Sequence, residues 1–316
     1  MTPEPLVASP TRRRAYWQTA FSLVVLLAAV WLARRHWPVL ETGAVRLAVA
    51  DQGWLLVAGT AAVGTWLCSA LAQQGAVSRR LPPGRLVAAQ FAASAANHVL
   101  PAGLGAGAVN LRFLMRCGLP AARSATAVAV KGTAGVIVRG VLIAVLTVAC
   151  PGVLRVPEAS PGLPVVLLAA AVVAGVSALL AGPLRQRCRG ALGAAVADVK
   201  AVHARPHRAA ALWGGSLAFA VLHCSVLIAV TQAVALPLPP ARVALLYLAA
   251  SSAAALLPTP GGLGSLDAAL AFALTAAGAP GAAAASAVLG YRLLTVWLPL
   301  LPGLLVLGVL VRRRAL

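Results

Sequence analysis

The hydrophobic positions of this chain form runs that are long enough to cross a lipid bilayer. A membrane-spanning helix needs about 20 consecutive, mostly apolar residues. We predict full spans at residues 17–37, 52–73, 120–150, 164–182, 209–236 and 281–311. The pattern therefore predicts an all-α polytopic membrane protein with about six full transmembrane helices.

Two further apolar segments, 85–117 and 241–278, are interrupted by proline and glycine. The first contains NHVLPAGLGAG and the second LLPTPGGLGSLD, which share Leu-Pro followed by Gly-Leu-Gly. Proline removes a backbone donor and glycine loosens the chain, so a helix ends at each motif. Such an end in hydrocarbon must be covered by protein or by a water-filled cavity. The residues that we predict to form these broken-helix gates are Asn97, Pro101, Gly103, Gly105, Pro258, Pro260, Gly261, Gly262 and Gly264.

The features that follow the two breaks come in the same order, which indicates an internal repeat. A helix-like run leads to Gly118 after the first break and to Gly278 after the second. A span rich in small residues follows in each case and carries a cation, Lys131 or Arg292. Chance similarity between two stretches rich in alanine, glycine and leucine is the alternative.

The distribution of arginine predicts how the chain crosses the membrane, because cytoplasmic loops carry an excess of basic residues. Arginine clusters lie at 12–14, 79–85, 185–208 and 312–314. With these clusters inside, each interrupted segment must enter and leave on one face, and the two faces are opposite. We therefore expect two oppositely oriented re-entrant hairpins in an inverted repeat with halves at about 85–150 and 241–311. Transporters built in this way bind their substrates near the membrane midplane.

The composition agrees with this topology and limits the partners. Hydrophobic residues make up 61% and charged residues 10% of the 316 positions, whereas soluble proteins average about 25% charged. The net charge of +20 comes from cations at the ends of apolar runs, which favours membrane phospholipids over nucleic acid as partners. We expect a cytoplasmic basic N-terminus (1–14) and a single transmembrane domain (15–316) with a cytoplasmic basic loop (183–208). The expected location is a bacterial inner membrane, with both termini cytoplasmic.

Few ionisable groups lie within the apolar segments. Of the six acidic residues only Asp267 does so, at the start of a half-helix, where it either caps the helix or serves a function. An intramembrane carboxylate costs about 2.5 kcal/mol or more, which favours a function. The cations farthest from any span end are Lys131, Arg139 and Arg292. We predict that these four residues line a headgroup path, with Asp267 paired to Arg292 or Lys131; an ion pair that only fixes packing is the alternative.

Three cations against one acid leave a positive surplus, which an anionic headgroup would neutralise. Nothing in the sequence indicates enzyme chemistry, because it contains no phosphate-binding loop, nucleophile elbow or dinucleotide fingerprint. We expect no catalytic residue, no metal and no cofactor. We interpret His223 as a packing residue and His98 as a hydrogen-bonding partner of the loosened backbone at the first break.

The motifs resemble a known family. LPTPGGLGSLDAAL, followed by YRLLTVWLPLLPGLL, is similar to the C-terminal signature of the lysylphosphatidylglycerol synthase transmembrane (flippase-like) family. NHVLPAGLGAGAVNLRFLMRCGLP is similar to an earlier motif of that family, and the resemblance spans roughly residues 15 to 312. It implies a protein that moves or binds lipid headgroups. It does not imply lysyl transfer, because the soluble transferase domain of the full synthases has no counterpart here.

The chain departs from the family pattern in two respects. Relatives usually carry a glutamate soon after each Gly-Leu-Gly break, whereas Asp267 follows the second break, and Ala106 and Gly107 follow the first. Lys131 stands where an arginine is expected, whereas Arg292 matches.

The leading hypothesis is a translocase or binder of an anionic or aminoacylated lipid headgroup. One alternative is an ion-coupled secondary transporter of a small solute, with Asp267 as a proton or cation site. Another is a non-transporting membrane subunit whose partner is a lipid-modifying transferase.

Overall fold

The computed structural model describes residues 41, 45–99, 104–149, 197, 199–255 and 264–313. The regular elements of these residues are all helical. They are α3 (Gln52–Gly75), α4 (Pro83–Val99), α5 (Leu104–Arg116), α6 (Ala121–Ala149), α10 (Pro206–Ala233), α11 (Pro240–Ala255), α12 (Ser265–Ala276), α13 (Gly281–Arg292), the π-helical turn η4 (Leu293–Trp297) and α14 (Leu298–Arg312). The chain is an all-α polytopic membrane protein, as predicted.

Four helices among the described residues are long and apolar enough to cross a membrane. They are α3, α6, α10 and the continuous helix Gly281–Arg312, which comprises α13, η4 and α14. These helices correspond to four of the predicted spans. The remaining two, 17–37 and 164–182, lie outside the described residues.

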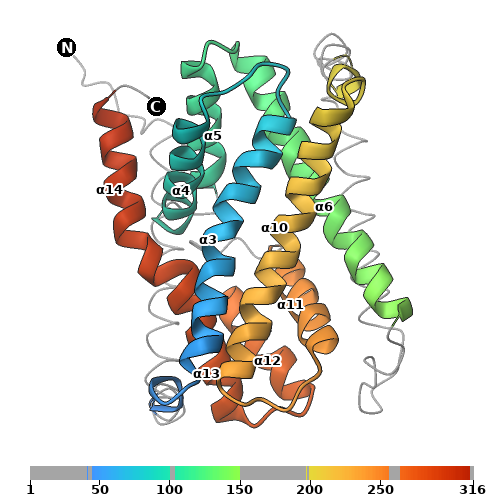
Figure 1. The fold of residues 1–316 in the computed structure, drawn as a ribbon, viewed down its shortest axis with the longest axis vertical. Coiled ribbons are helices and arrows are strands. Elements are labelled where there is room, and N and C mark those ends of the chain that lie inside the picture. The colour runs from blue at the N-terminus through green and yellow to red at the C-terminus, as the bar shows by residue number, and fades with distance from the viewer. Residues whose placement is uncertain are drawn as a thin grey trace, which may run out of the picture.

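Helices α3 and α10 run side by side along the molecule (Figure 1). Their contact depends on small residues, and a Cβ atom built at Gly215 would lie 2.6 Å from the backbone nitrogen of Ala72. Close approach of backbones through small residues is a main source of helix association in lipid. The α3–α10 pair is therefore packed so closely that a side chain at Gly215 would force the two backbones apart.

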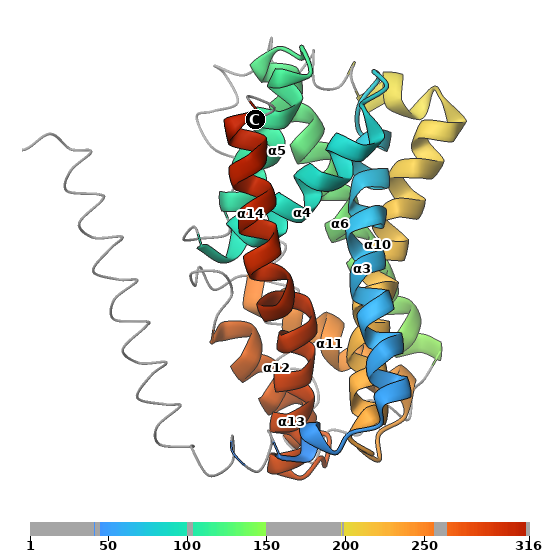
Figure 2. The same cartoon turned by 60° about the vertical axis from the view of Figure 1, so that its left-hand side comes forward.

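The interrupted segments form two pairs of short helices in opposite halves of the molecule (Figure 2). Helices α4 (83–99) and α5 (104–116) fall in the segment predicted at 85–117. Helices α11 (240–255) and α12 (265–276) fall in the segment predicted at 241–278. Each pair packs together, and α4 also packs against α14. The two broken segments thus exist where the sequence places them.

The turns that follow the two broken pairs have the same geometry. Gly118 and Gly278 adopt positive φ angles of 86° and 95°. Their amides donate to Met115 and Thr275 at 3.0 and 2.9 Å, and the next amide in each case reaches back five residues. This is the Schellman arrangement, which a left-handed glycine permits at a helix C-terminus. The two halves therefore agree at this turn, while the inverted relation of the repeat stays a prediction.

Basic residues gather at one end of the molecule, where α3, α5 and α14 end and α6 and α10 begin (Figures 1 and 2). The guanidinium of Arg208 near the start of α10 donates to the carbonyl oxygens of Gln74 and Val77. A cation at a helix C-terminus satisfies carbonyls that have no partner within the helix. This contact joins the first turn of α10 to the end of α3.

The adjacent glycines Gly214 and Gly215 test the packing of α3 on α10. Gly215→Ala should lower the unfolding free energy by about 1–3 kcal/mol, because the added methyl group meets the backbone of α3. Gly214→Ala should not destabilise the protein, because nothing lies within 4 Å of a Cβ atom at that position and alanine favours a helix. Thermal unfolding of both variants in detergent measures the difference, and equal melting temperatures would contradict the described contact.

Candidate functional site

A cavity of about 540 Å³ lies between the two broken helix pairs and the long helices. Its volume falls in the range of small-molecule sites, about 300–1,000 Å³. Residues beside both breaks line it: Asn97 and His98 at the end of α4, Ala254 and Ala255 at the end of α11, and Leu266 at the start of α12. The interrupted helices therefore end at a cavity inside the protein, where ends of this kind are tolerated.

Lys131 of α6 is held in a polar network at the side of the cavity formed by α3, α4 and α5. Its ammonium group donates to Ser69 Oγ at 2.9 Å and to Gln90 Oε1 at 2.7 Å. Gln90 Nε2 in turn donates to Asn110 Oδ1 at 2.7 Å, and Asn110 Nδ2 donates to the carbonyl of Ala106 at 2.8 Å. Helices α3, α4, α5 and α6 are thereby joined through one chain of hydrogen bonds. The network contains a positive charge and no carboxylate.

Arg292 and Asp267 form an ion pair, which is one of the two pairings predicted for this acid. Arg292 Nε donates to Asp267 Oδ1, while the amide of Gly264 donates to Asp267 Oδ2 at 3.0 Å. Asp267 thus caps α12 and pairs with Arg292 at the same time, while a function of this acid beyond the cap and the pair stays a prediction. The Arg292 side chain is buried and lines the cavity, whereas Asp267 is 33% exposed and lies outside the lining.

The lining carries a positive surplus. Lys131, Arg139 and Arg292 all line the cavity. Between residues that the structure describes, the one ion pair is that of Arg292 with Asp267. Lys131 and Arg139 therefore have no carboxylate partner in this part of the chain. All four predicted headgroup residues lie at or beside one cavity, and two of the positive charges there are not neutralised by an acid.

A hydrogen-bonded chain of aromatic side chains lies on the opposite side of the cavity from α4. His223 Nδ1 is 3.0 Å from the hydroxyl of Tyr291, which is 3.0 Å from the hydroxyl of Tyr247. His223 also makes an edge contact with Phe219, with ring centroids 4.6 Å apart. The interpretation of His223 as a packing residue is therefore incomplete, because its ring lines the cavity and takes part in this chain.

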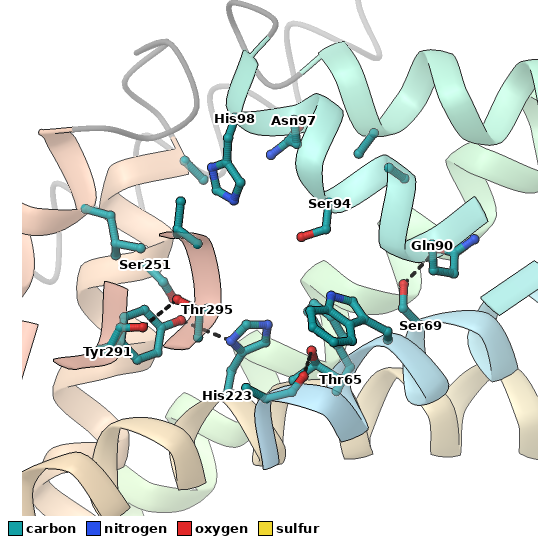
Figure 3. Close-up of a pocket in the computed structure, with 18 of the residues that line it drawn as sticks. Thr65, Ser69, Gln90, Ser94, Asn97, His98, His223, Ser251, Tyr291 and Thr295 are labelled. Carbon is teal, nitrogen blue, oxygen red and sulfur yellow. Dashed lines mark hydrogen bonds between the residues drawn. The ribbon is translucent and has the colours of Figure 1, made fainter. Parts of the chain in front are cut away.

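One face of α4 presents polar groups to the cavity. Figure 3 shows Ser94, Asn97 and His98 facing His223 and Tyr291 across the open space. Of this face, only Asn97 and His98 were predicted to have a role. Gln90, Ser94 and Asn97 recur at four- and three-residue intervals, and this helical spacing within an apolar run is the signal that would have revealed the face.

The predicted gate residues divide into two groups. Asn97, Gly105 and Gly264 are described, and a Cβ atom at Gly105 would lie 2.1 Å from the carbonyl oxygen of Ala96, so α5 meets α4 closely. Gly264 begins α12 with a φ of 87°. The others lie outside the described residues: Pro101, Gly103, Pro258, Pro260, Gly261 and Gly262.

The last span changes its winding directly after Arg292. The π-helical turn Leu293–Trp297 places Thr295 and Val296 in the cavity lining. Pro299 follows and has no amide to donate to the carbonyl of Thr295, which interrupts the α-helical ladder here. Turns of this kind are frequent at functional sites.

Comparison with known proteins adds one match. A family model described as the lysylphosphatidylglycerol synthase TM region matches residues 19–303. That range contains both broken helix pairs and every cavity residue discussed above. Among curated proteins, none matches the chain.

The ion pair can be tested by comparing two acids that cap helices. Asp267→Asn should lower the unfolding free energy by about 2 kcal/mol, because Arg292 keeps its buried charge and loses its carboxylate. Asp51→Asn at the start of α3 is the control, because Asp51 is exposed and accepts only the amide of Trp54 in its capping role. Asparagine caps about as well as aspartate, so the control should change stability little. Equal melting temperatures of the two variants would contradict a stabilising pair.

Proposed function

Because this chain belongs to the lysylphosphatidylglycerol synthase TM region family, we propose that it binds an anionic or aminoacylated lipid headgroup in the cavity and moves it across the membrane. The observation that carries the proposal is the charge of the cavity. Lys131 and Arg139 line it without a carboxylate partner among the described residues. Arg292 also lines it and is paired with Asp267.

Charge neutralisation explains why a phosphate would enter. Charges without a counter-ion in a low-dielectric site are costly, so a partly buried cation such as Lys131 or Arg139 gains when an anion takes the place of water. Lys131 and Arg139 lie eight residues apart on α6, which separates them by about 12 Å along the helix axis. A headgroup that passes along this helix would meet one cation after the other, while its acyl chains stay in the bilayer.

The broken helices supply the movable parts of the proposed mechanism. The ends of α4, α11 and α12 border the cavity from two halves of the molecule, so displacement of either pair would open it on a different side. The π-helical turn after Arg292 interrupts the α-helical winding of the last span beside the cavity, so the span bends most easily there. We propose that alternate opening of the two pairs exposes the headgroup site to one face and then to the other.

The basic end of the molecule gives the proposed orientation. The ends of α3, α5 and α14 and the start of α10 lie at this end (Figure 1). The basic residues in these helix ends or directly beside them are Arg79, Arg80, Arg116, Arg205 and Arg312. By the positive-inside rule we place this end in the cytoplasm of a bacterial cell.

A headgroup-accessibility assay in liposomes tests the proposal. Phosphatidylglycerol that carries an acyl-chain fluorophore is bleached from outside, and the protected inner-leaflet fraction is followed over time. The wild type should bring the inner-leaflet lipid to the outside faster than empty liposomes. The double variant Lys131→Gln/Arg139→Gln should be slower by about tenfold or more, because it removes both unpaired charges.

The matched control is Arg112→Gln/Arg116→Gln on α5, which removes the same charge from two exposed residues outside the cavity lining. It should move lipid at the wild-type rate. Wild-type protein that is folded and yet matches empty liposomes would contradict the proposed function.

A further inference from the structure

We infer that the headgroup taken by this cavity is a phosphate ester whose remaining polar groups are uncharged hydroxyls, and that aminoacylated headgroups are rejected. The inference rests on the proposed function and narrows its substrate class. It follows from which charges face the cavity, which hydrogen-bonding groups accompany them, and where an acid is missing.

The charged groups that face the cavity are all basic. Lys131, Arg139 and Arg292 line it together with the imidazoles of His98 and His223, and none of the described lining residues is an aspartate or glutamate. An aminoacyl group brings at least one ammonium ion beside the phosphate. Like charges held close together in a low-dielectric site repel each other strongly unless a carboxylate lies between them, so the lining opposes such a headgroup.

Asp267 does not provide the missing carboxylate. Both of its oxygens are engaged, Oδ1 by Arg292 Nε and Oδ2 by the amide of Gly264. Its side chain is also not part of the cavity lining, whereas that of Arg292 is. An incoming ammonium group would have to share this carboxylate with Arg292, which already neutralises its charge.

The uncharged polar groups of the lining suit hydroxyls. Ser94 and Asn97 of α4 face the open space opposite Tyr291 and Ser251 of the second half (Figure 3). Hydroxyl and amide side chains both donate and accept, so they match a glycerol-type or sugar-type hydroxyl whichever way its hydrogen points. The cationic side chains would bind the phosphate, and the uncharged hydroxyl and amide side chains would form hydrogen bonds with the headgroup hydroxyls.

Ala106 is the position at which the absence of an acid matters most. It lies in the first turn of α5, it lines the cavity, and its carbonyl ends the hydrogen-bonded chain that begins at Lys131. A glutamate at this position would add a carboxylate to the cavity that Lys131 also lines, at a helix N-terminus, where a negative charge is favoured. The neighbouring Gly107 is not part of the cavity lining, and nothing lies within 4 Å of a Cβ atom built there.

The experiment compares two lipids that differ only in the aminoacyl group. Liposomes contain wild-type protein and a trace of acyl-labelled phosphatidylglycerol or of acyl-labelled lysyl-phosphatidylglycerol, and bleaching from outside reports the rate of each. The wild type should move phosphatidylglycerol at least about tenfold faster. Ala106→Glu should raise the rate of the lysyl lipid relative to that of phosphatidylglycerol, whereas Ala106→Gln, of equal size and no charge, should not.

Gly107→Glu is the matched control, because it adds the same charge one residue away and outside the lining. It should keep the wild-type preference, and thermal unfolding checks that each variant is folded. Should Ala106→Glu fail to fold, the wild-type ratio of the two rates decides alone.

The outcomes separate this inference from the proposed function. Movement of the lysyl lipid by the wild type at the same rate as phosphatidylglycerol, or faster, would overturn the inference and leave a lipid translocase in place. A folded wild type that moves neither lipid would contradict the proposed function, and the inference would fall with it.

Discussion

A helix that ends inside a membrane must have its terminal backbone groups covered, and the centre of this protein is arranged around such ends. Helices α4 and α11 stop short of a full span, and α5 and α12 start anew beyond the breaks. The long helices α3, α6, α10 and Gly281–Arg312 lie around these ends and leave a cavity beside them. Because a cavity can hold water or ligand, the breaks become acceptable at the place where a polar headgroup would be bound.

The second constraint is the balance of charge in that cavity. One ion pair fixes the beginning of α12 against the last span, since Asp267 caps its own helix and binds Arg292. The first broken pair has no equivalent acid, and Lys131 is instead held by the neutral oxygens of Ser69 and Gln90. The two halves therefore share their breaks and turns and differ in charge. This difference in charge is the basis for the proposed anionic ligand.

Much of this arrangement was predictable because proline and glycine interrupt a helix wherever they cluster, and because an acid is rare in an apolar segment. The Leu-Pro and Gly-Leu-Gly motifs mark the ends of half-helices, and Gly118 and Gly278 mark the turns that follow. The sequence offers only one acid within the apolar segments, so the pairing of Asp267 was restricted to a few cations. Which of them it binds depends on how α12 lies against the last span, and that is a property of the fold.

The neutral polar residues of the site were not predicted, for a related reason. The hydrogen bond from Lys131 to Ser69 joins residues 62 positions apart, and that between His223 and Tyr291 joins residues 68 apart. No local pattern indicates such contacts. A serine, glutamine or tyrosine within an apolar helix is common, and the sequence alone does not distinguish it from a packing residue. Its role is visible only when the fold brings its partner from another helix. Only the spacing of Gln90, Ser94 and Asn97 on α4 carried a usable signal.

The central claim is that the unpaired cations of the cavity bind an anionic lipid headgroup, and native mass spectrometry tests it most directly. Protein extracted in mild detergent and offered equal amounts of phosphatidylglycerol and phosphatidylcholine should retain a single phosphatidylglycerol molecule. The Lys131→Gln/Arg139→Gln variant should lose that preference, because it removes the two lining cations that have no carboxylate partner among the described residues. Equal retention of the two lipids by the wild type, or an unchanged preference in the variant, would contradict the account.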